Sequence, residues 1–103
     1  MLVGKFLAEF LGTFVFLSVI ITTVESHNLY TTSQAWLKIG LALSVCILAF
    51  GFISGGHYNP AVSFMFYTNN QLSLEDFIGY VGGQLLGAHA AYVYYNMTKN
   101  YLK

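Results

Sequence analysis

The sequence predicts an all-α membrane protein with three transmembrane helices and one re-entrant half-helix. Only 8% of its residues are charged and 56% are hydrophobic, whereas a soluble domain carries about 25% charged residues. A chain of 103 residues cannot bury so much apolar surface within itself, because small domains leave a large share of their surface exposed. Long apolar runs, separated by polar segments, therefore indicate membrane spans.

Composition and residue spacing argue against several classes of protein. The formal net charge is zero and the sequence has no basic patch, so we expect no nucleic-acid partner. Cys46 is the only cysteine; this excludes an intrachain disulfide and favours a small buried side chain. The three histidines lack metal-ligand spacing, and no nucleophile–base or carboxylate pair is evident. We therefore expect no metal, no cofactor and no enzymatic activity.

The first predicted span covers residues 2–24. A helix needs roughly 20 mostly apolar residues to cross a bilayer, and this run supplies them with Glu9 as an ionisable residue inside it. It has no basic start beyond Lys5 and exceeds the usual apolar length of a signal peptide, about 7–15 residues. We expect it to be retained as a helix, followed by a polar connecting loop at residues 25–33.

The second and third predicted spans cover residues 35–52 and 74–95. Trp36 suits an interfacial anchor near the start of the second span. Ser73 can cap the start of the third span, and acidic residues follow in its first turn. The third span also carries small residues four positions apart, which lie on one helix face and permit a close approach to a neighbour: Gly79, Gly83, Gly87 and Ala91.

A short segment at residues 54–68 separates the second and third spans. Asn59 is a favoured N-cap, whose side-chain oxygen accepts from backbone N–H groups of the next turn, and Pro60 fits the first helical position. The helix ends near Thr68 and is about 12 Å long, less than half of a hydrocarbon core of roughly 30 Å. Irregular backbone at this depth is tolerated only where protein buries it or a watery cavity lines it. A cavity or pore is therefore predicted beside residues 55–59.

Three sequence motifs occur in order along these predicted elements, and together they resemble the amino-terminal half of a major intrinsic protein, the aquaporin and aquaglyceroporin family. The Asn-Pro-Ala box alone is a common helix start, so the order and spacing of all three motifs carry the resemblance. They are Ala8-Glu9-Phe10-Leu11-Gly12-Thr13-Phe14, Ser54-Gly55-Gly56-His57-Tyr58-Asn59-Pro60-Ala61-Val62 and Gly82-Gly83-Gln84-Leu85-Leu86-Gly87-Ala88.

The resemblance implies an integral, multi-pass membrane protein that forms a passive channel for water and for small neutral solutes such as glycerol. Members of the family contain two inverted halves, each with three spans and one half-helix, and the two half-helices meet at the bilayer centre. The positive ends of these helices disfavour cations. The pore-facing groups expected here are the Asn59 amide, the backbone carbonyls of Gly55, Gly56, His57 and Tyr58, and the apolar side chains of Phe16, Val62 and Ile39.

The resemblance also implies supporting roles for three polar residues. It favours Glu9 as a buried carboxylate that accepts hydrogen bonds from the loop between Gly55 and His57. We expect His57 to tie this loop to Glu9, and Gln84 to make an interhelical hydrogen bond. Pro60 and the glycine face of the third span are expected to support the structure.

The resemblance covers only the first half of the family's pattern. The sequence contains no second box and no arginine, and Ile39 takes the second-span filter position, where orthodox water channels have an aromatic residue. An aliphatic residue there makes glycerol and other small neutral solutes plausible. A single copy cannot enclose a family-type pore, which leaves three alternatives. The chain pairs with an inverted second copy, pairs with a second polypeptide, or is a non-conducting remnant that packs into a larger channel through its glycine face.

Overall fold

The structure is a computed structural model that describes residues 1–25 and 34–101. Its regular structure is entirely helical within these ranges, so the predicted all-α fold class is confirmed. Of the predicted loop at residues 25–33, Glu25 belongs to the first helix instead, and residues 26–33 lie outside the described residues. The helices are α1 (Leu2–Glu25), α3 (Ala35–Ser54), α4 (Pro60–Thr68) and α5 (Leu74–Thr98), followed by a short 3₁₀ helix, η1 (Lys99–Tyr101).

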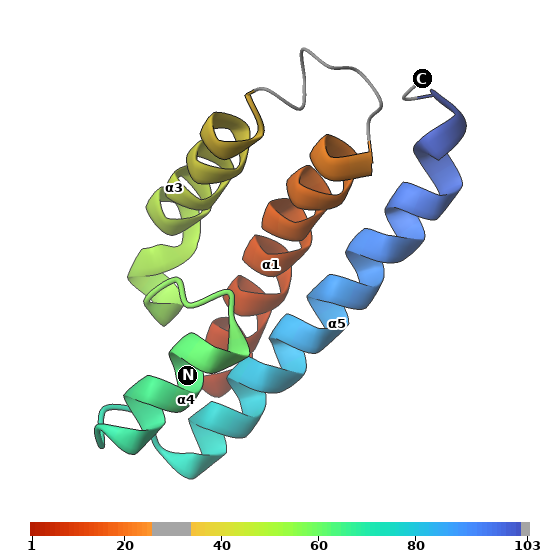
Figure 1. Cartoon of the computed structure of the whole chain (residues 1–103). Helices are drawn as coiled ribbons and strands as arrows, with labels where there is room; N and C mark the ends of the chain where they lie inside the picture. The colour runs from red at the N-terminus through yellow and green to blue at the C-terminus, as the bar shows by residue number, and fades with distance from the viewer. Residues whose placement is uncertain (26–33, 102–103) are drawn as a thin grey trace.

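Three long helices lie side by side, and α1 packs against both α3 and α5 (Figure 1). Helices α1 and α5 run in the same direction, whereas α3 runs in the opposite one. By length and composition, α1 and α3 are apolar enough to cross a membrane; α5 is equally long, with 25 residues, but less apolar. The long axis of the molecule measures 43 Å, which exceeds a hydrocarbon core of roughly 30 Å.

The short helix α4 has nine residues, or about 13 Å at 1.5 Å per residue. It begins part-way along the bundle and runs toward the end where α5 starts (Figure 1). The predicted cap at its start is confirmed, because Asn59 Oδ1 accepts a 2.8 Å hydrogen bond from the Ala61 N–H and Pro60 is the first helical residue. The chain thus leaves α3, turns back toward the middle, and returns to the same end.

Three helices are longer than predicted from the sequence, and α1 exceeds its predicted span of residues 2–24 by one residue, Glu25. Helix α3 continues through Ser54 instead of ending at Phe52, because the stop is supplied by Gly55. This glycine has a left-handed φ of 91° and donates its N–H to the Gly51 carbonyl at 2.8 Å, a common way to end a helix. Helix α5 continues to Thr98 instead of ending near Tyr95, since its sequence contains no glycine or proline there.

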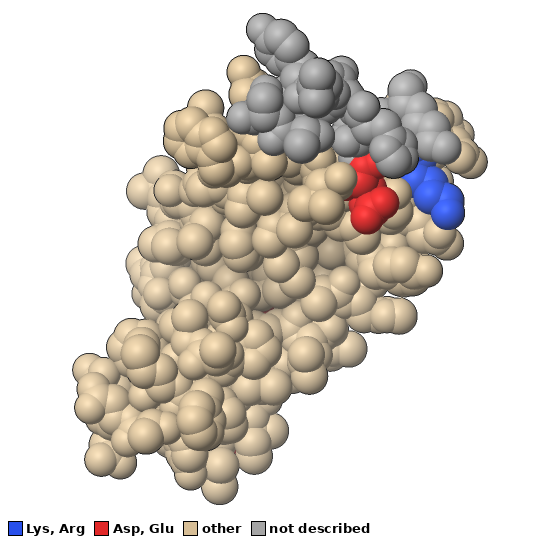
Figure 2. All heavy atoms as spheres, viewed as in Figure 1, with Lys and Arg blue, Asp and Glu red and all other residues tan. Residues whose placement is uncertain are grey.

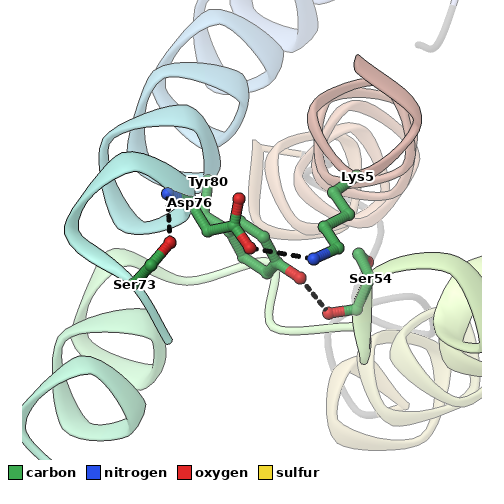
Figure 3. Close-up of polar contacts among 5 residues, drawn as sticks. All are labelled: Lys5, Ser54, Ser73, Asp76 and Tyr80. Carbon is green, nitrogen blue, oxygen red and sulfur yellow. Dashed lines mark hydrogen bonds and ion pairs between the residues drawn. The ribbon is translucent and has the colours of Figure 1, made fainter. Parts of the chain in front are cut away.

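A polar cluster fastens the starts of α1 and α5 to each other (Figure 3). Ser73 caps α5 as predicted, by accepting from the Asp76 N–H at 3.0 Å. The Asp76 carboxylate in turn accepts from the Lys5 ammonium of α1 at 2.8 Å. One turn further along α5, the Tyr80 hydroxyl donates to the carbonyl of Ser54, the last residue of α3, at 2.5 Å. The ends of three helices are therefore linked around one point.

The glycine face of α5 packs directly onto α1. A Cβ at Gly83 would lie 2.8 Å from the Phe6 carbonyl oxygen, and one at Gly87 would lie 2.7 Å from the Phe10 carbonyl oxygen. Only glycine permits this backbone approach. The expectation that this face holds a larger channel together is therefore wrong, because α1 of the same chain already covers it.

The exterior of the molecule is apolar and its interior is unusually polar. Leu48 and Phe52 are more than four-fifths exposed, whereas Glu9 and Ser63 are completely buried. The face shown in Figure 2 carries no charged side chain over most of its area, and charges appear only near the end where α1 and α5 finish. This distribution suits a chain whose outer surface contacts lipid and whose ionisable Glu9 lies inside.

Candidate functional site: the re-entrant segment and its anchor

The site is built around the buried carboxylate of Glu9 on α1. Its Oε2 accepts from the Ser54 hydroxyl at 2.6 Å and from the His57 N–H at 3.1 Å. Its Oε1 accepts from the Tyr58 N–H at 2.7 Å and from the Gln84 side-chain amide at 2.8 Å. An ionised carboxylate is an acceptor only, and these four donors satisfy it without water. One side chain thus joins α1, the end of α3, the re-entrant loop and α5.

Only some of the expected loop N–H groups bind Glu9. His57 donates its backbone N–H to Glu9 as expected, but Gly55 and Gly56 do not. The Gly55 N–H caps α3, and the Gly56 N–H donates to the Ser54 hydroxyl oxygen at 3.2 Å. The carboxylate therefore holds the second half of the loop, which leads directly into Asn59.

Gln84 links the Glu9 carboxylate to α4. Its side-chain nitrogen donates to Glu9 Oε1 and also to the Ser63 hydroxyl oxygen, both at 2.8 Å. Ser63 in turn lies 2.8 Å from His57 Nδ1. Gln84 makes the expected interhelical hydrogen bond, and a second one besides. The His57 ring is tied to Ser63, and only its backbone reaches Glu9.

Tyr58 holds the loop in place through contacts with α1 and α3. Its hydroxyl donates to the Cys46 carbonyl at 2.6 Å, and its ring covers Gly12, where a Cβ would lie 2.0 Å from Tyr58 Cε1. The residue is 2% exposed and has a left-handed φ of 54°, which is costly for a bulky residue. The hydroxyl bond, the ring contact and the N–H bond to Glu9 together hold it in this conformation.

The loop also contains unpaired backbone acceptors. Within the part of the chain that the structure describes, the carbonyls of residues 55–58 accept no hydrogen bond from protein groups. At the end of this run, Asn59 is exposed, and its oxygen is occupied by the Ala61 N–H, so its NH2 group remains available to donate. Four acceptors and one fixed donor therefore follow one another at the start of α4.

The three apolar residues assigned to the pore lie on three different elements. Phe16 on α1, Ile39 on α3 and Val62 on α4 are each half-buried. Ile39 precedes Ser54 by fifteen residues on the same helix, or about 22 Å of helix, so it lies far from the Glu9 carboxylate. Their pore-lining role stays a prediction.

Sequence reasoning missed three polar contributors to the site. Ser54 and Ser63 bond to Glu9 and Gln84 respectively, and the Tyr80 hydroxyl bonds to the end of α3. Serine and tyrosine are common in helices, and their partners lie 21 to 45 residues away in the sequence. The one available signal was the position of Ser63, which is four residues after Asn59 and so lies one turn further along α4.

Comparison with known proteins shows which family has this arrangement. Residues 1–102 match the family described as major intrinsic protein. The chain belongs to the major intrinsic protein family. Members of this family are integral, multi-pass membrane proteins that act as channels, so the chain is a multi-pass membrane protein with the fold of an aquaporin half.

Similar members of the major intrinsic protein family come from bacteria, animals and plants. The chain is 43% identical over 89 residues to "Glycerol uptake facilitator protein-like 6" of Lactiplantibacillus plantarum, covering 84% of this chain and 40% of that protein. It is 52% identical over 66 residues to "Lens fiber major intrinsic protein" of Ovis aries, covering 63% and 25%. It is 33% identical over 93 residues to "Aquaporin NIP3-1" of Arabidopsis thaliana, covering 86% and 29%. The chain therefore spans less than half the length of each of these relatives.

Proposed function

We propose that this chain forms one half of the wall of a passive channel for water and small neutral solutes such as glycerol, and that it conducts only when paired with a second half. The observation that carries the proposal is the row of unpaired carbonyls at residues 55–58 that ends at the Asn59 amide. In a membrane, an unpaired backbone group costs several kcal/mol unless water or another polar group reaches it. A file of water supplies such a partner.

The same row of groups fits the passage of neutral molecules. Water and alcohols can donate to the carbonyls and accept from the Asn59 amide, so each contact replaces one that the solute loses on leaving bulk water. The amino end of α4 carries roughly half a positive charge, which disfavours cations at this point. The apolar side chains of Phe16 and Val62 would add few polar contacts, so that a solute passes without binding tightly.

Two observations support glycerol as a solute beside water. A relative that is 43% identical carries the name glycerol uptake facilitator protein-like 6. Ile39 on α3 is aliphatic and would make the narrow part of the pore wider and less polar than an aromatic residue would. Small polyols are therefore the solutes that we expect beside water.

The second half would cover the part of the bundle that α4 leaves open. Helix α4 runs along only one end of the molecule (Figure 1), and Gly55 in the loop and Asn59 and Pro60 at the start of α4 are exposed. An inverted second copy of this chain, a different polypeptide or a further part of a longer protein can each supply a second half-helix. We propose that the chain pairs with a second half, whichever of these three sources provides it.

A non-conducting structural or interaction protein is the alternative. It is favoured by the bonds that hold the re-entrant loop, since Glu9 binds the His57 and Tyr58 N–H groups within the chain itself and needs no solute or second half to do so. The chain would then retain the fold of the family without its activity. Flux measurements distinguish the channel from the non-conducting alternative, because only the channel has a solute flux that depends on Asn59.

The test compares two asparagines at opposite ends of α4 in liposomes with measurable flux. Asn59 caps the start of the helix and Asn69 its end, and both are exposed. We expect Asn59→Asp to lower water and glycerol flux or to admit cations, because it places a carboxylate at the donor position. Asn69→Asp should leave both fluxes and the exclusion of cations unchanged. Equal behaviour of the two variants contradicts the role of Asn59. Flux no faster than in empty liposomes fits either a missing second half or the non-conducting alternative, and excludes a pore built by inverted copies of this chain.

A further inference from the structure

One buried chain of side chains connects Glu9 to the ring of His57, and its hydrogen bonds have a defined direction. Glu9 accepts from Gln84, Gln84 also donates to Ser63, and Ser63 lies against His57 Nδ1. Glu9 and Ser63 are completely buried, and Gln84 is 2% exposed. Water therefore cannot reverse these bonds by supplying another partner.

The donors and acceptors along this row of hydrogen bonds determine where the Ser63 hydroxyl proton points. The Glu9 carboxylate can only accept, so Gln84 must turn its NH2 group toward it. That NH2 group has two hydrogens, and the second points to the Ser63 oxygen. Ser63 then has its own hydrogen left to donate. Among the contacts that the structure describes for its hydroxyl, the one remaining acceptor is His57 Nδ1 at 2.8 Å.

His57 Nδ1 must therefore carry a lone pair, so a neutral imidazole has its proton on Nε2. This edge of the ring faces the space that Gly55 leaves open. A Cβ at Gly55 would lie 3.5 Å from His57 Nε2 and 3.7 Å from Cδ2, and Gly55 is exposed. Nothing in the described part of the chain accepts a hydrogen bond from Nε2.

The His57 ring also packs against two aromatic neighbours. Phe66 stacks on it with centroids 4.8 Å apart and an interplanar angle of 16°. Tyr80 lies on it at 4.9 Å with an angle of 52°. A ring held by Ser63 at one nitrogen and by two aromatic side chains has little freedom to turn. The direction of the Nε2–H bond is thereby set.

We propose that Ser63 is a positioning residue that keeps His57 protonated at Nε2, so that this N–H becomes a second fixed donor, two residues before Asn59 in the sequence, for the oxygen of water or of a neutral alcohol. The contact with a solute rests on the proposed channel function, whereas the tautomer does not. The carbonyls of residues 55–58 can only accept, so a donor among them gives a passing oxygen a partner before it reaches Asn59.

The tautomer can be tested by nitrogen NMR of the chain in lipid bilayers with ¹⁵N-labelled histidine. A His27→Gln, His89→Gln double variant leaves His57 as the only histidine. At neutral pH we expect one neutral tautomer, with a protonated Nε2 and an Nδ1 that accepts a hydrogen bond. Polarisation transfer from water should reach Nε2 and not Nδ1. A protonated Nδ1, or a mixture of both tautomers, would overturn the assignment.

The Ser63→Ala variant tests whether Ser63 positions the His57 ring through a hydrogen bond or only packs beside it. We expect loss of the shift that the accepted hydrogen bond gives to Nδ1, with the ring still stacked on Phe66, and recovery of that shift in Ser63→Thr. An unchanged Nδ1 resonance in Ser63→Ala overturns the role of Ser63. The NMR result does not depend on flux. A protein that has the expected tautomer but does not conduct contradicts only the channel function. A protein that conducts but has the His57 proton on Nδ1 contradicts only the role of Ser63.

Discussion

The Glu9 carboxylate and the Tyr58 backbone N–H lie 2.7 Å apart, although 49 positions separate them in the sequence. This bond crosses from the first helix to the residue just before the Asn59 cap. It determines which way the loop faces, because Tyr58 turns its N–H and its side chain inward, toward α1 and α3. The carbonyls of residues 55–58 and the Asn59 amide nitrogen are left without protein partners in the described part of the chain, and the proposed channel function requires such free groups.

Replacement of Glu9 tests whether its charge holds the loop. Glu9→Gln keeps the shape but introduces an NH2 group among four donors, so at least one buried donor loses its acceptor. We expect the free energy of unfolding in detergent micelles to fall by about 1–3 kcal/mol for each unsatisfied donor. Glu25→Gln, at the exposed end of α1, is the control and should change it by no more than about 0.5 kcal/mol. Similar losses for both variants would contradict the anchoring role.

The contact between Gly12 and Tyr58 predicts a strong effect of one added methyl group. Gly12→Ala places a Cβ about where the Tyr58 ring lies, so the ring and the loop must move. We expect a loss of about 1–3 kcal/mol in stability, together with lower solute flux wherever flux is measurable. Gly40→Ala, which meets nothing within 4 Å, should be neutral or stabilising by up to about 1 kcal/mol. If Gly12→Ala behaves like Gly40→Ala, the ring does not occupy this position.

Two adjacent glycines of α5 should respond differently to the same substitution. A Cβ at Gly83 meets the Phe6 carbonyl oxygen at 2.8 Å, whereas one at Gly82 meets only a Phe6 ring carbon at 3.8 Å. Gly83→Ala should therefore destabilise the protein by about 1–3 kcal/mol through separation of α1 and α5. Gly82→Ala should be neutral or stabilising. Thermal unfolding of both variants in the same detergent is the measurement, and a reversed order would contradict the observed packing of the two helices.

The ion pair between Lys5 and Asp76 should contribute little stability. Its side chains are 33% and 22% exposed, and partly exposed pairs are typically worth about 0.2–1 kcal/mol. A double-mutant cycle with Lys5→Met and Asp76→Asn should give a coupling energy in this range. The coupling should shrink as salt is added, because exposed charges are screened. A coupling that salt leaves unchanged would mean that the pair is shielded from solvent.

The fold could be predicted from the sequence because each element has a local cause. Apolar runs of sufficient length gave the long helices, and Asn59-Pro60 gave the start of α4. The predicted end of α3 at Phe52 is two residues early, because the stop depends on the left-handed backbone of Gly55. Helix ends depend on single backbone angles, which composition does not reveal.

The site was predictable only in part. Glu9 is recognisable as an ionisable residue in an apolar run, and the resemblance to the family motif predicts that it binds the loop. The choice of His57 and Tyr58 over Gly55 and Gly56 depends on the path of the loop, and the contributions of Ser63 and Tyr80 depend on how helices pack. These are relations between distant parts of the chain, and no local pattern encodes them.

The dependence of water flux on pairing tests the central claim most directly. Stopped-flow osmotic shrinkage is measured on liposomes in which the chain is progressively diluted with lipid, while crosslinking follows the fraction of paired chains. We expect the water permeability per chain to rise and fall with the paired fraction and to disappear when chains are isolated. Flux per chain that stays constant on dilution, or paired chains that conduct no water, would contradict it.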